Sequence, residues 1–146
     1  MNYFIDNMVY LTRRERFNSA HRLFNPDFSD EKNYRFYGKC ANPNWHGHNY
    51  ELFVTVKGEV DPVTGVILNL KELSQIIKTK IIEKLDHKNL NIEVGFLQNK
   101  IVSTENIIVA IWNELNTEIL KTNAQLHKIR LVETENNYAE YYGEKK

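Results

Sequence analysis

Two stretches of this 146-residue chain alternate between apolar and polar side chains, and each carries histidine on its apolar side. Residues 46–57 begin with His46-Gly47-His48 and continue with apolar side chains at every second position. Successive side chains of a strand point to opposite faces, so both imidazoles continue the buried face of this strand. Residues 9–21 alternate in the same way and place His21 with their apolar side chains. The pattern therefore predicts two long strands that bring imidazoles into the interior.

The remaining periodicities predict an α+β fold. Asn69 caps a helix that runs to about residue 86, with Glu72 as its capping-box partner, and Ser103 or Thr104 caps a second helix. A short helix is expected at 29–36 in an otherwise polar excursion. The four expected strands are 9–21, 46–57, 126–134 and 138–143. The order β-β-α-α-β-β predicts an antiparallel four-stranded sheet with two helices on one face.

Composition indicates one ordinary domain spanning residues 1–146. Hydrophobic residues make up 42% of the chain, and Lys plus Arg equal Asp plus Glu at 19 each. This balance gives no general electrostatic reason to bind nucleic acid or an anionic membrane, and no apolar run approaches the length of a membrane span. The single cysteine excludes an internal disulfide, and Met1–Tyr10 lacks the pattern of a signal peptide. We expect a soluble cytoplasmic protein.

Three histidines on inward strand positions form a candidate metal site. Three neutral imidazoles with an open fourth position are the ligand set of a catalytic zinc, and burying several imidazoles without partners is costly. The alternative is that His46-Gly47-His48 forms a turn and that His21 is a satisfied interior histidine. Cys40 lies in a polar, partly basic loop, which favours a reactive thiol near the metal over a ligand. As a lone cysteine it is also compatible with a small buried hydrophobe.

Two acidic positions have both a structural and a functional interpretation. Glu133 shares the apolar side of its strand with Ile129 and Leu131, where a carboxylate is unusual. It is either an ion-pair partner or a group that accepts two parallel N–H bonds from a 2-amino-4-oxo pyrimidine edge. The Asp86-His87 pair at a helix C-terminus is either a dipole-favoured end or an oriented proton shuttle.

Several segments, in order and spacing, resemble the 6-pyruvoyl-tetrahydropterin synthase family. They are FNSAHRL, GKCANPNWHGHNYELFVTVKGEVDPVTG, LDHKNLN, STEN and VETENN, and the likeness extends to the closing YYGE. The resemblance implies the tunnelling fold (T-fold), in which trimeric barrels stack face to face as a homohexamer, a dimer of trimers. It also implies roles for individual residues. These are His21, His46 and His48 as zinc ligands, Cys40, Asp86 and His87 as catalytic residues, and Glu133, Thr104 and Glu105 as pterin-binding residues.

The same resemblance implies a lyase that converts 7,8-dihydroneopterin triphosphate to 6-pyruvoyl-tetrahydropterin with loss of triphosphate, as in tetrahydrobiopterin biosynthesis. Five residues separate Cys40 from His46, whereas the related 6-carboxy-tetrahydropterin synthases of queuosine biosynthesis usually have a tighter C-x-x-x-H-G-H. Trp45 stands where the family is expected to have glycine. Lys39 and Arg35 are candidates for binding the triphosphate. The alternatives are the carboxy-forming enzyme, a non-catalytic pterin-binding module and a plain metal-binding protein.

Overall fold

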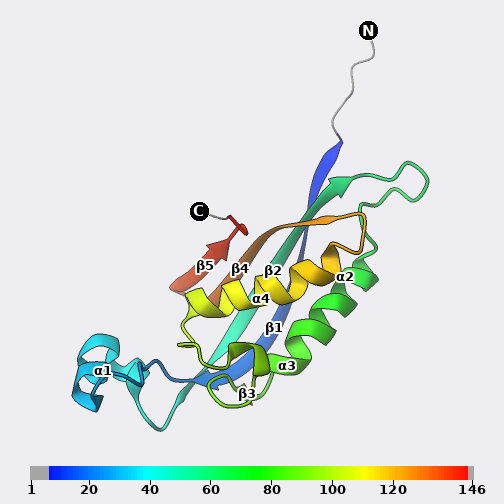
Figure 1. Ribbon diagram of the computed structural model, residues 1–146. Coiled ribbons are helices and arrows are strands. Elements are labelled where there is room, and N and C mark those ends of the chain that lie inside the picture. Colours follow the sequence, from blue (N-terminus) through cyan, green and yellow to red (C-terminus); the bar gives the residue numbers. More distant parts are fainter. Residues whose placement is uncertain (1–6, 145–146) are drawn as a thin grey trace.

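A five-stranded sheet carries the helices α2, α3 and α4 on one face (Figure 1). The structure is a computed structural model that describes residues 7–144. Most of Met1–Tyr10, to which the prediction on a signal peptide applies, lies outside the described residues. The spatial order of the strands is β3-β1-β2-β4-β5. Their bounds are β1 Met8–His21, β2 His46–Glu59, β3 Lys88–Asn89, β4 Gln125–Thr134 and β5 Asn137–Tyr141.

The two alternating stretches form the antiparallel pair β1 and β2 in the predicted orientation. Their register places His21 opposite His46, and Phe17 opposite Tyr50. The Phe17 and Tyr50 rings stack with centroids 4.8 Å apart beneath the helices. The inward positions of β2 are fully buried from Tyr50 onward: Tyr50, Leu52, Val54 and Val56. The helix-covered face of the sheet is thus the core face. The histidines of β1 and β2 lie at one end of this face.

A two-residue strand makes the sheet mixed, whereas four antiparallel strands were predicted. Strand β3 pairs with β1 in parallel, Lys88 beside Ser19 and Asn89 beside Ala20. The chain reaches this position through His87, which adopts a left-handed φ of 59°. The His87 backbone N–H donates to the carbonyl of Asn18 at 2.6 Å. The pairing of β3 with β1 is built from backbone hydrogen bonds. The pattern of apolar and polar side chains therefore could not predict this strand.

The first long helix is a rod with an internal π turn. It consists of α2 Leu70–Ile77, a π segment Lys78–Ile82 and α3 Glu83–Leu85. Its fully buried side chains recur every four residues: Leu73, Ile77, Ile81 and Leu85. In an α-helix each step of four residues turns the side chain about 40° past a full turn. The wider π turn offsets this drift and keeps the four side chains on one face.

The second long helix, α4 Thr104–Ile119, begins where the sequence predicts, with the side chain of Ser103 accepting a hydrogen bond from the Asn106 N–H. It packs against β4 and β5 and is joined to the first rod by ion pairs from Lys80 and Lys84. Helix α1 Asp30–Tyr37 lies apart from this layer (Figure 1) and leads through the 3-10 turns Gly38–Ala41 to β2, and a further 3-10 turn spans Gly95–Leu97. Among the described residues, no helix combines the length and the apolar character that crossing a membrane requires.

Candidate metal centre and ligand-binding site

The three predicted histidines converge at the end of the β1–β2 pair. Their ring centroids are separated by 4.6 Å for His21 and His46, 5.1 Å for His21 and His48, and 5.0 Å for His46 and His48. One ring nitrogen from each lies within 4.8 Å of the others. A tetrahedral zinc with bonds of about 2.0–2.1 Å holds nitrogen ligands about 3.4 Å apart, so small ring movements bring all three into bonding distance.

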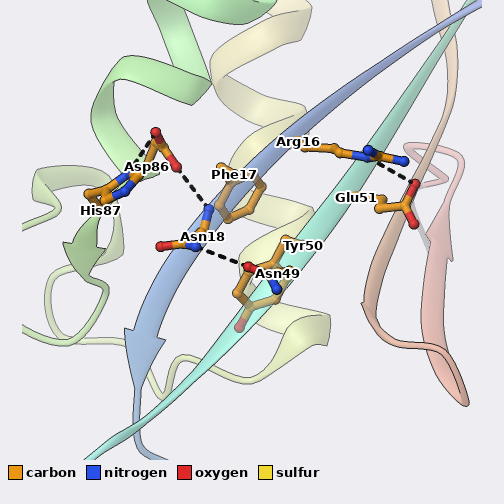
Figure 2. A pocket seen from close by; sticks show the side chains of 8 residues that line it. All are labelled: Arg16, Phe17, Asn18, Asn49, Tyr50, Glu51, Asp86 and His87. Atoms are coloured by element: carbon orange, nitrogen blue, oxygen red, sulfur yellow. Dashed lines mark hydrogen bonds and ion pairs between the residues drawn. The ribbon is translucent and has the colours of Figure 1, made fainter.

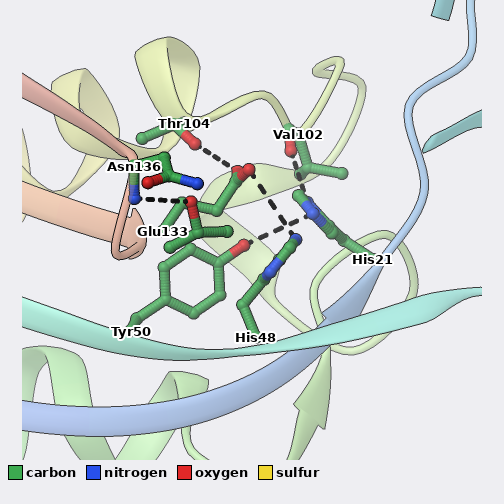
Figure 3. Close-up of polar contacts among 8 residues, drawn as sticks. His21, His48, Tyr50, Val102, Thr104, Glu133 and Asn136 are labelled. Atoms are coloured by element: carbon green, nitrogen blue, oxygen red, sulfur yellow. Dashed lines mark hydrogen bonds and ion pairs between the residues drawn. The ribbon is translucent and has the colours of Figure 1, made fainter.

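His21 is oriented and kept neutral by its surroundings. Its side chain is almost completely buried, and its Nδ1 lies 2.8 Å from the Val102 carbonyl oxygen (Figure 3). A carbonyl oxygen only accepts, so Nδ1 carries the hydrogen and Nε2 keeps the lone pair that a metal needs. Burial is the largest cause that lowers the pKa of His21, to about 4. Burial, followed by the neighbouring His48, also lowers the pKa of His46.

The unpaired nitrogen atoms of this cluster fit a metal ion. Within residues 7–144, the buried side-chain nitrogens without a hydrogen-bond partner include both ring nitrogens of His46 and Nε2 of His48. Buried polar groups in folded proteins are almost always paired, because an unpaired group loses its water without compensation. Neutral imidazoles offer the nitrogen donors that Zn²⁺ and related cations accept. The residues present therefore fit a bound divalent cation.

A carboxylate faces the histidine cluster from β4. Oε1 of Glu133 lies 3.7 Å from Nε2 of His48, and Oε2 accepts a hydrogen bond from the Thr104 hydroxyl at the start of α4 (Figure 3). Glu133 occupies the inward position that the alternation of β4 predicted. Thr104, Glu105 and Glu133 also line one cavity of about 430 Å³, together with the turn between β4 and β5. The structure thus brings the three predicted pterin-binding residues together.

Tyr50 belongs to this site, although the sequence indicated only a core position for it. Its hydroxyl lies 3.4 Å from Nε2 of His21, and its side chain has no exposed surface. Burial, followed by the nearby charges of Glu133 and Cys40, raises the pKa of Tyr50 well above its usual range, so the hydroxyl stays protonated. The sequence feature that could have indicated this role is a tyrosine hydroxyl two residues after His48, on the inward side of β2.

Cys40 lies in the 3-10 turn Gly38–Ala41 and is partly buried. The histidine cluster does not include it, and its role as a reactive thiol near the metal stays a prediction. Its backbone carbonyl accepts a hydrogen bond of 2.8 Å from the Leu23 N–H. This bond ties the turn to the chain two residues beyond His21.

Asp86 and His87 line a different cavity, of about 420 Å³, together with residues of β1 and β2 (Figure 2). Asp86 accepts a hydrogen bond of 2.9 Å from the Asn18 backbone N–H, and its other oxygen lies 2.9 Å from Nδ1 of His87. The Asn18 bond is the largest cause that lowers the pKa of Asp86. The predicted pair is therefore formed and oriented, but it lines a cavity other than the one that holds Glu133.

The chain is similar to known proteins over nearly its full length. The family model described as 6-pyruvoyl tetrahydropterin synthase matches residues 10–144. The 6-pyruvoyl tetrahydrobiopterin synthase of Homo sapiens is 43% identical over 134 residues, covering 92% of this chain and 91% of the human one. That of Dictyostelium discoideum is 44% identical over 136 residues, covering 93% and 97% of the two chains. The solved structure of Caenorhabditis elegans 6-pyruvoyl tetrahydropterin synthase has a TM-score of 0.86 at 32% identity, covering 94% of this chain and 96% of that one.

The sheet, its helices and the histidine cluster define an α+β protein of the T-fold class with a candidate metal site beside a carboxylate-lined cavity. The chain belongs to the 6-pyruvoyl tetrahydropterin synthase family. The resemblance carried by the sequence motifs is confirmed, and so is the fold that it implied.

Proposed function

We propose that this protein is a 6-pyruvoyl tetrahydropterin synthase, a lyase that converts 7,8-dihydroneopterin triphosphate to 6-pyruvoyl-tetrahydropterin and releases triphosphate. The observation that carries the proposal is the convergence of three imidazoles beside Glu133 in a chain of this family. A metal site alone would suit many reactions. The adjacent carboxylate adds a means of holding a flat heterocycle in one orientation.

Zn²⁺ is the metal that the donor set suits best, held by His21, His46 and His48. When bound, it supplies Lewis-acid stabilisation of negative charge on the side-chain oxygens of the substrate. The Val102 carbonyl fixes the tautomer of His21 in which Nε2 carries no hydrogen. Tyr50 closes the buried side of the cluster with a neutral hydroxyl.

Glu133 anchors the pterin ring in this proposal. A carboxylate accepts two parallel N–H bonds from the 2-amino and ring N–H groups of the pterin edge. Thr104 holds the carboxylate in place by its hydrogen bond, and Glu105 lines the same cavity. Fixing the ring edge decides which carbon of the side chain is presented to the catalytic base.

Cys40 acts as the base that removes a carbon-bound proton from the substrate side chain. The ring is reduced while the side chain is oxidised, so the proton shifts are internal to the substrate and no nicotinamide is consumed. Asp86 and His87 relay the complementary proton, with Asp86 orienting the His87 ring through Nδ1. The two proton-transfer groups then act on opposite sides of the substrate.

The separation of the two cavities supports an active site that is shared between subunits of a homohexamer. Within one chain, Asp86 and His87 line one cavity while Glu133 and Thr104 line another. Assembly as a dimer of trimers would let the Asp86–His87 pair of one subunit face the Cys40 and histidine cluster of its neighbour. The edge strands β3 and β5 leave backbone groups available for such contacts.

The direct test is to incubate the zinc-reconstituted protein with 7,8-dihydroneopterin triphosphate and identify the products by mass spectrometry. Release of triphosphate together with 6-pyruvoyl-tetrahydropterin supports the proposal. Formation of 6-carboxy-tetrahydropterin with acetaldehyde would assign the queuosine-type reaction instead. Tight pterin binding without triphosphate release would show a non-catalytic binding module.

A further inference from the structure

One guanidinium nitrogen in the described part of the chain is buried without a partner. Arg22 directly follows His21, and its Nε atom is buried with no hydrogen bond. Within residues 7–144, the other unpaired buried side-chain nitrogens all belong to His46 and His48. A metal accounts for the imidazole nitrogens but not for a cation, which a metal would repel. The Arg22 guanidinium therefore calls for an anion.

Arg22 is held in a fixed orientation by aromatic rings and by its backbone. Its guanidinium carbon lies 4.2 Å from the centroid of the Phe24 ring and 5.9 Å from that of Trp45. The Asn91 side chain accepts from the Arg22 N–H at 2.9 Å and donates to the Arg22 carbonyl at 3.0 Å. A guanidinium that stacks through its faces keeps its edge N–H groups free for paired bonds to a phosphate.

Trp45 adopts a backbone conformation that favours glycine. It directly precedes His46 and has a φ of 69°, in the left-handed region where a bulky side chain is strained. Such strain persists only where surrounding contacts hold the residue in place. The contact between its ring and Arg22 gives this tryptophan a function that a glycine could not perform.

Arg22 and Lys39 line a common cavity of about 720 Å³. Its other lining residues are Asp30, Asn33, Tyr34, Ala41, Asn42 and Pro43. Two cationic side chains against the single carboxylate of Asp30 leave the lining positively charged. The Leu23-to-Cys40 backbone bond places the segment that carries Arg22 beside the segment that carries Lys39. The cavity therefore opens where the metal-ligand strand and the thiol turn meet.

We propose that this cavity binds the triphosphate arm of the substrate, with Arg22 as the principal anchor and Lys39 as the second cation; the proposal rests on the proposed function. A pterin held at Glu133, with its side-chain oxygens at the metal, carries its phosphates past the histidines. Arg22 follows His21 and Trp45 precedes His46, and His21 and His46 face each other at the end of the antiparallel pair. Arg22 and Trp45 are therefore the first residues past that end on the two chain segments of the pair. We do not assign this role to Arg35, because it lines another cavity and pairs with Glu31 at 2.7 Å on the exposed side of α1.

Inorganic triphosphate is the probe, and calorimetric titration at fixed ionic strength is the measurement. We expect Arg22→Gln to weaken triphosphate binding at least 10-fold and Lys39→Gln to weaken it several-fold. The matched control Arg35→Gln removes the same charge from outside the cavity and should change binding less than twofold. Trp45→Gly should weaken binding several-fold without lowering the melting temperature, because it relieves the strained φ while removing the ring from Arg22.

Equal binding by the wild type, Arg22→Gln and Lys39→Gln would overturn the proposal, as would an equal loss in Arg35→Gln. Lys39 is exposed, so its variant keeps the test decisive if Arg22→Gln folds poorly. In turnover, Arg22→Gln should raise the KM for dihydroneopterin triphosphate but leave the binding of unphosphorylated dihydroneopterin unchanged.

The two proposals fail in different ways. If the wild type turns over the substrate and Arg22→Gln changes neither triphosphate binding nor KM, the cavity assignment is wrong and the proposed function stands. If the wild type binds triphosphate through Arg22 but does not turn over the substrate, the cavity binds polyphosphate as inferred and the proposed function is wrong.

Discussion

The Thr104 hydroxyl donates a hydrogen bond to Glu133 and thereby joins the first residue of α4 to the end of β4 (Figure 3). One carboxylate oxygen is thus engaged within the protein while the other points toward His48. The two residues are 29 positions apart in sequence. A carboxylate that is fixed in this way can recognise a ligand edge without first losing the freedom of its own side chain.

Replacing Glu133 by glutamine should weaken pterin binding by roughly 10–100-fold, since a hydrogen bond to a charged group contributes about 1.5–3 kcal/mol. Glutamine keeps the shape but turns its amide N–H toward the donors of the pterin edge. The loss should be seen as a higher KM and a weaker pterin affinity in fluorescence titration, with metal content unchanged. Thr104→Val removes only the hydrogen bond that orients the carboxylate, so it should weaken pterin binding less than Glu133→Gln does. An unaltered KM in Glu133→Gln would show that the carboxylate is structural.

His46→Ala should abolish tight metal binding, because two imidazoles do not replace three in a site that leaves the fourth position open. Elemental analysis should find roughly one zinc per subunit in the wild type and less than about a tenth of that in the variant. A zinc excess of about 100 times the dissociation constant should stabilise the wild type by about 2.7 kcal/mol and leave the variant unchanged.

His127→Ala is the matched control for metal binding. His127 lies on β4 beside the Tyr10 ring, with centroids 4.6 Å apart, and does not belong to the histidine cluster. Its variant should retain full zinc content. Equal zinc in His46→Ala and the wild type would reject the ligand assignment.

The alternation of β1 and β2 predicted the strands and their inward faces, and it made His21, His46 and His48 a candidate cluster. This succeeded because a two-residue period places side chains on a face whatever the distant partners are. The buried stripe of α4 was predicted for the same reason: Ile107, Ile108, Ile111, Leu115 and Ile119 are all buried. Glu133 was placed correctly because its parity is fixed by Ile129 and Leu131.

Features that depend on backbone hydrogen bonds or on distant contacts were not predictable. Strand β3 consists of Lys88 and Asn89, which have no strand-forming tendency and pair through backbone groups alone. The π turn changes the period of a helix whose side chains still fit an ordinary helical pattern. The unpaired Nε of Arg22 and the aromatic contacts of its guanidinium with Phe24 and Trp45 are set by the tertiary fold.

Asp86→Asn should reduce stability at neutral pH but not at low pH. The Asn18 N–H, followed by His87, lowers the pKa of Asp86 in the folded protein. A carboxylate with a lowered folded-state pKa stabilises the fold above its unfolded value, near 3.8, and this contribution is lost as the pH falls through the folded-state pKa. The side chain is 37% exposed, so screening limits the effect to about 0.5–1 kcal/mol.

Chemical denaturation of both proteins from pH 7 to pH 2 measures this effect. Glu118 and Glu140 also have lowered pKa values, but they titrate in both proteins, so the difference between the two curves isolates Asp86. The stability gap should be constant above about pH 5 and should close toward pH 2. A gap that stays the same over the whole range would mean that Asp86 acts through its shape and not its charge.

Cys40→Ala should lower kcat by about 10²–10⁴-fold, the range expected when a positioned proton-transfer group is removed. Zinc content and pterin affinity should be unchanged, since the thiol lies outside the histidine cluster and makes no hydrogen bond to Glu133 among the described residues. Elemental analysis and equilibrium titration separate this outcome from misfolding. Full activity in the variant would remove the thiol base from the mechanism.

Mixing two inactive variants should restore activity if the site is shared between subunits. Cys40→Ala and His87→Ala each remove one proton-transfer group, and the lining of the cavity that holds His87 does not include Cys40. In a randomly reassembled homohexamer, a site that takes Cys40 from one subunit and His87 from its neighbour is intact in roughly a quarter of cases. Refolding the variants together should therefore recover about a quarter of wild-type activity. As a control, mixtures of Cys40→Ala with Cys40→Ser should recover no activity. If the mixture of Cys40→Ala with His87→Ala also recovers none, Cys40 and His87 act within the same chain.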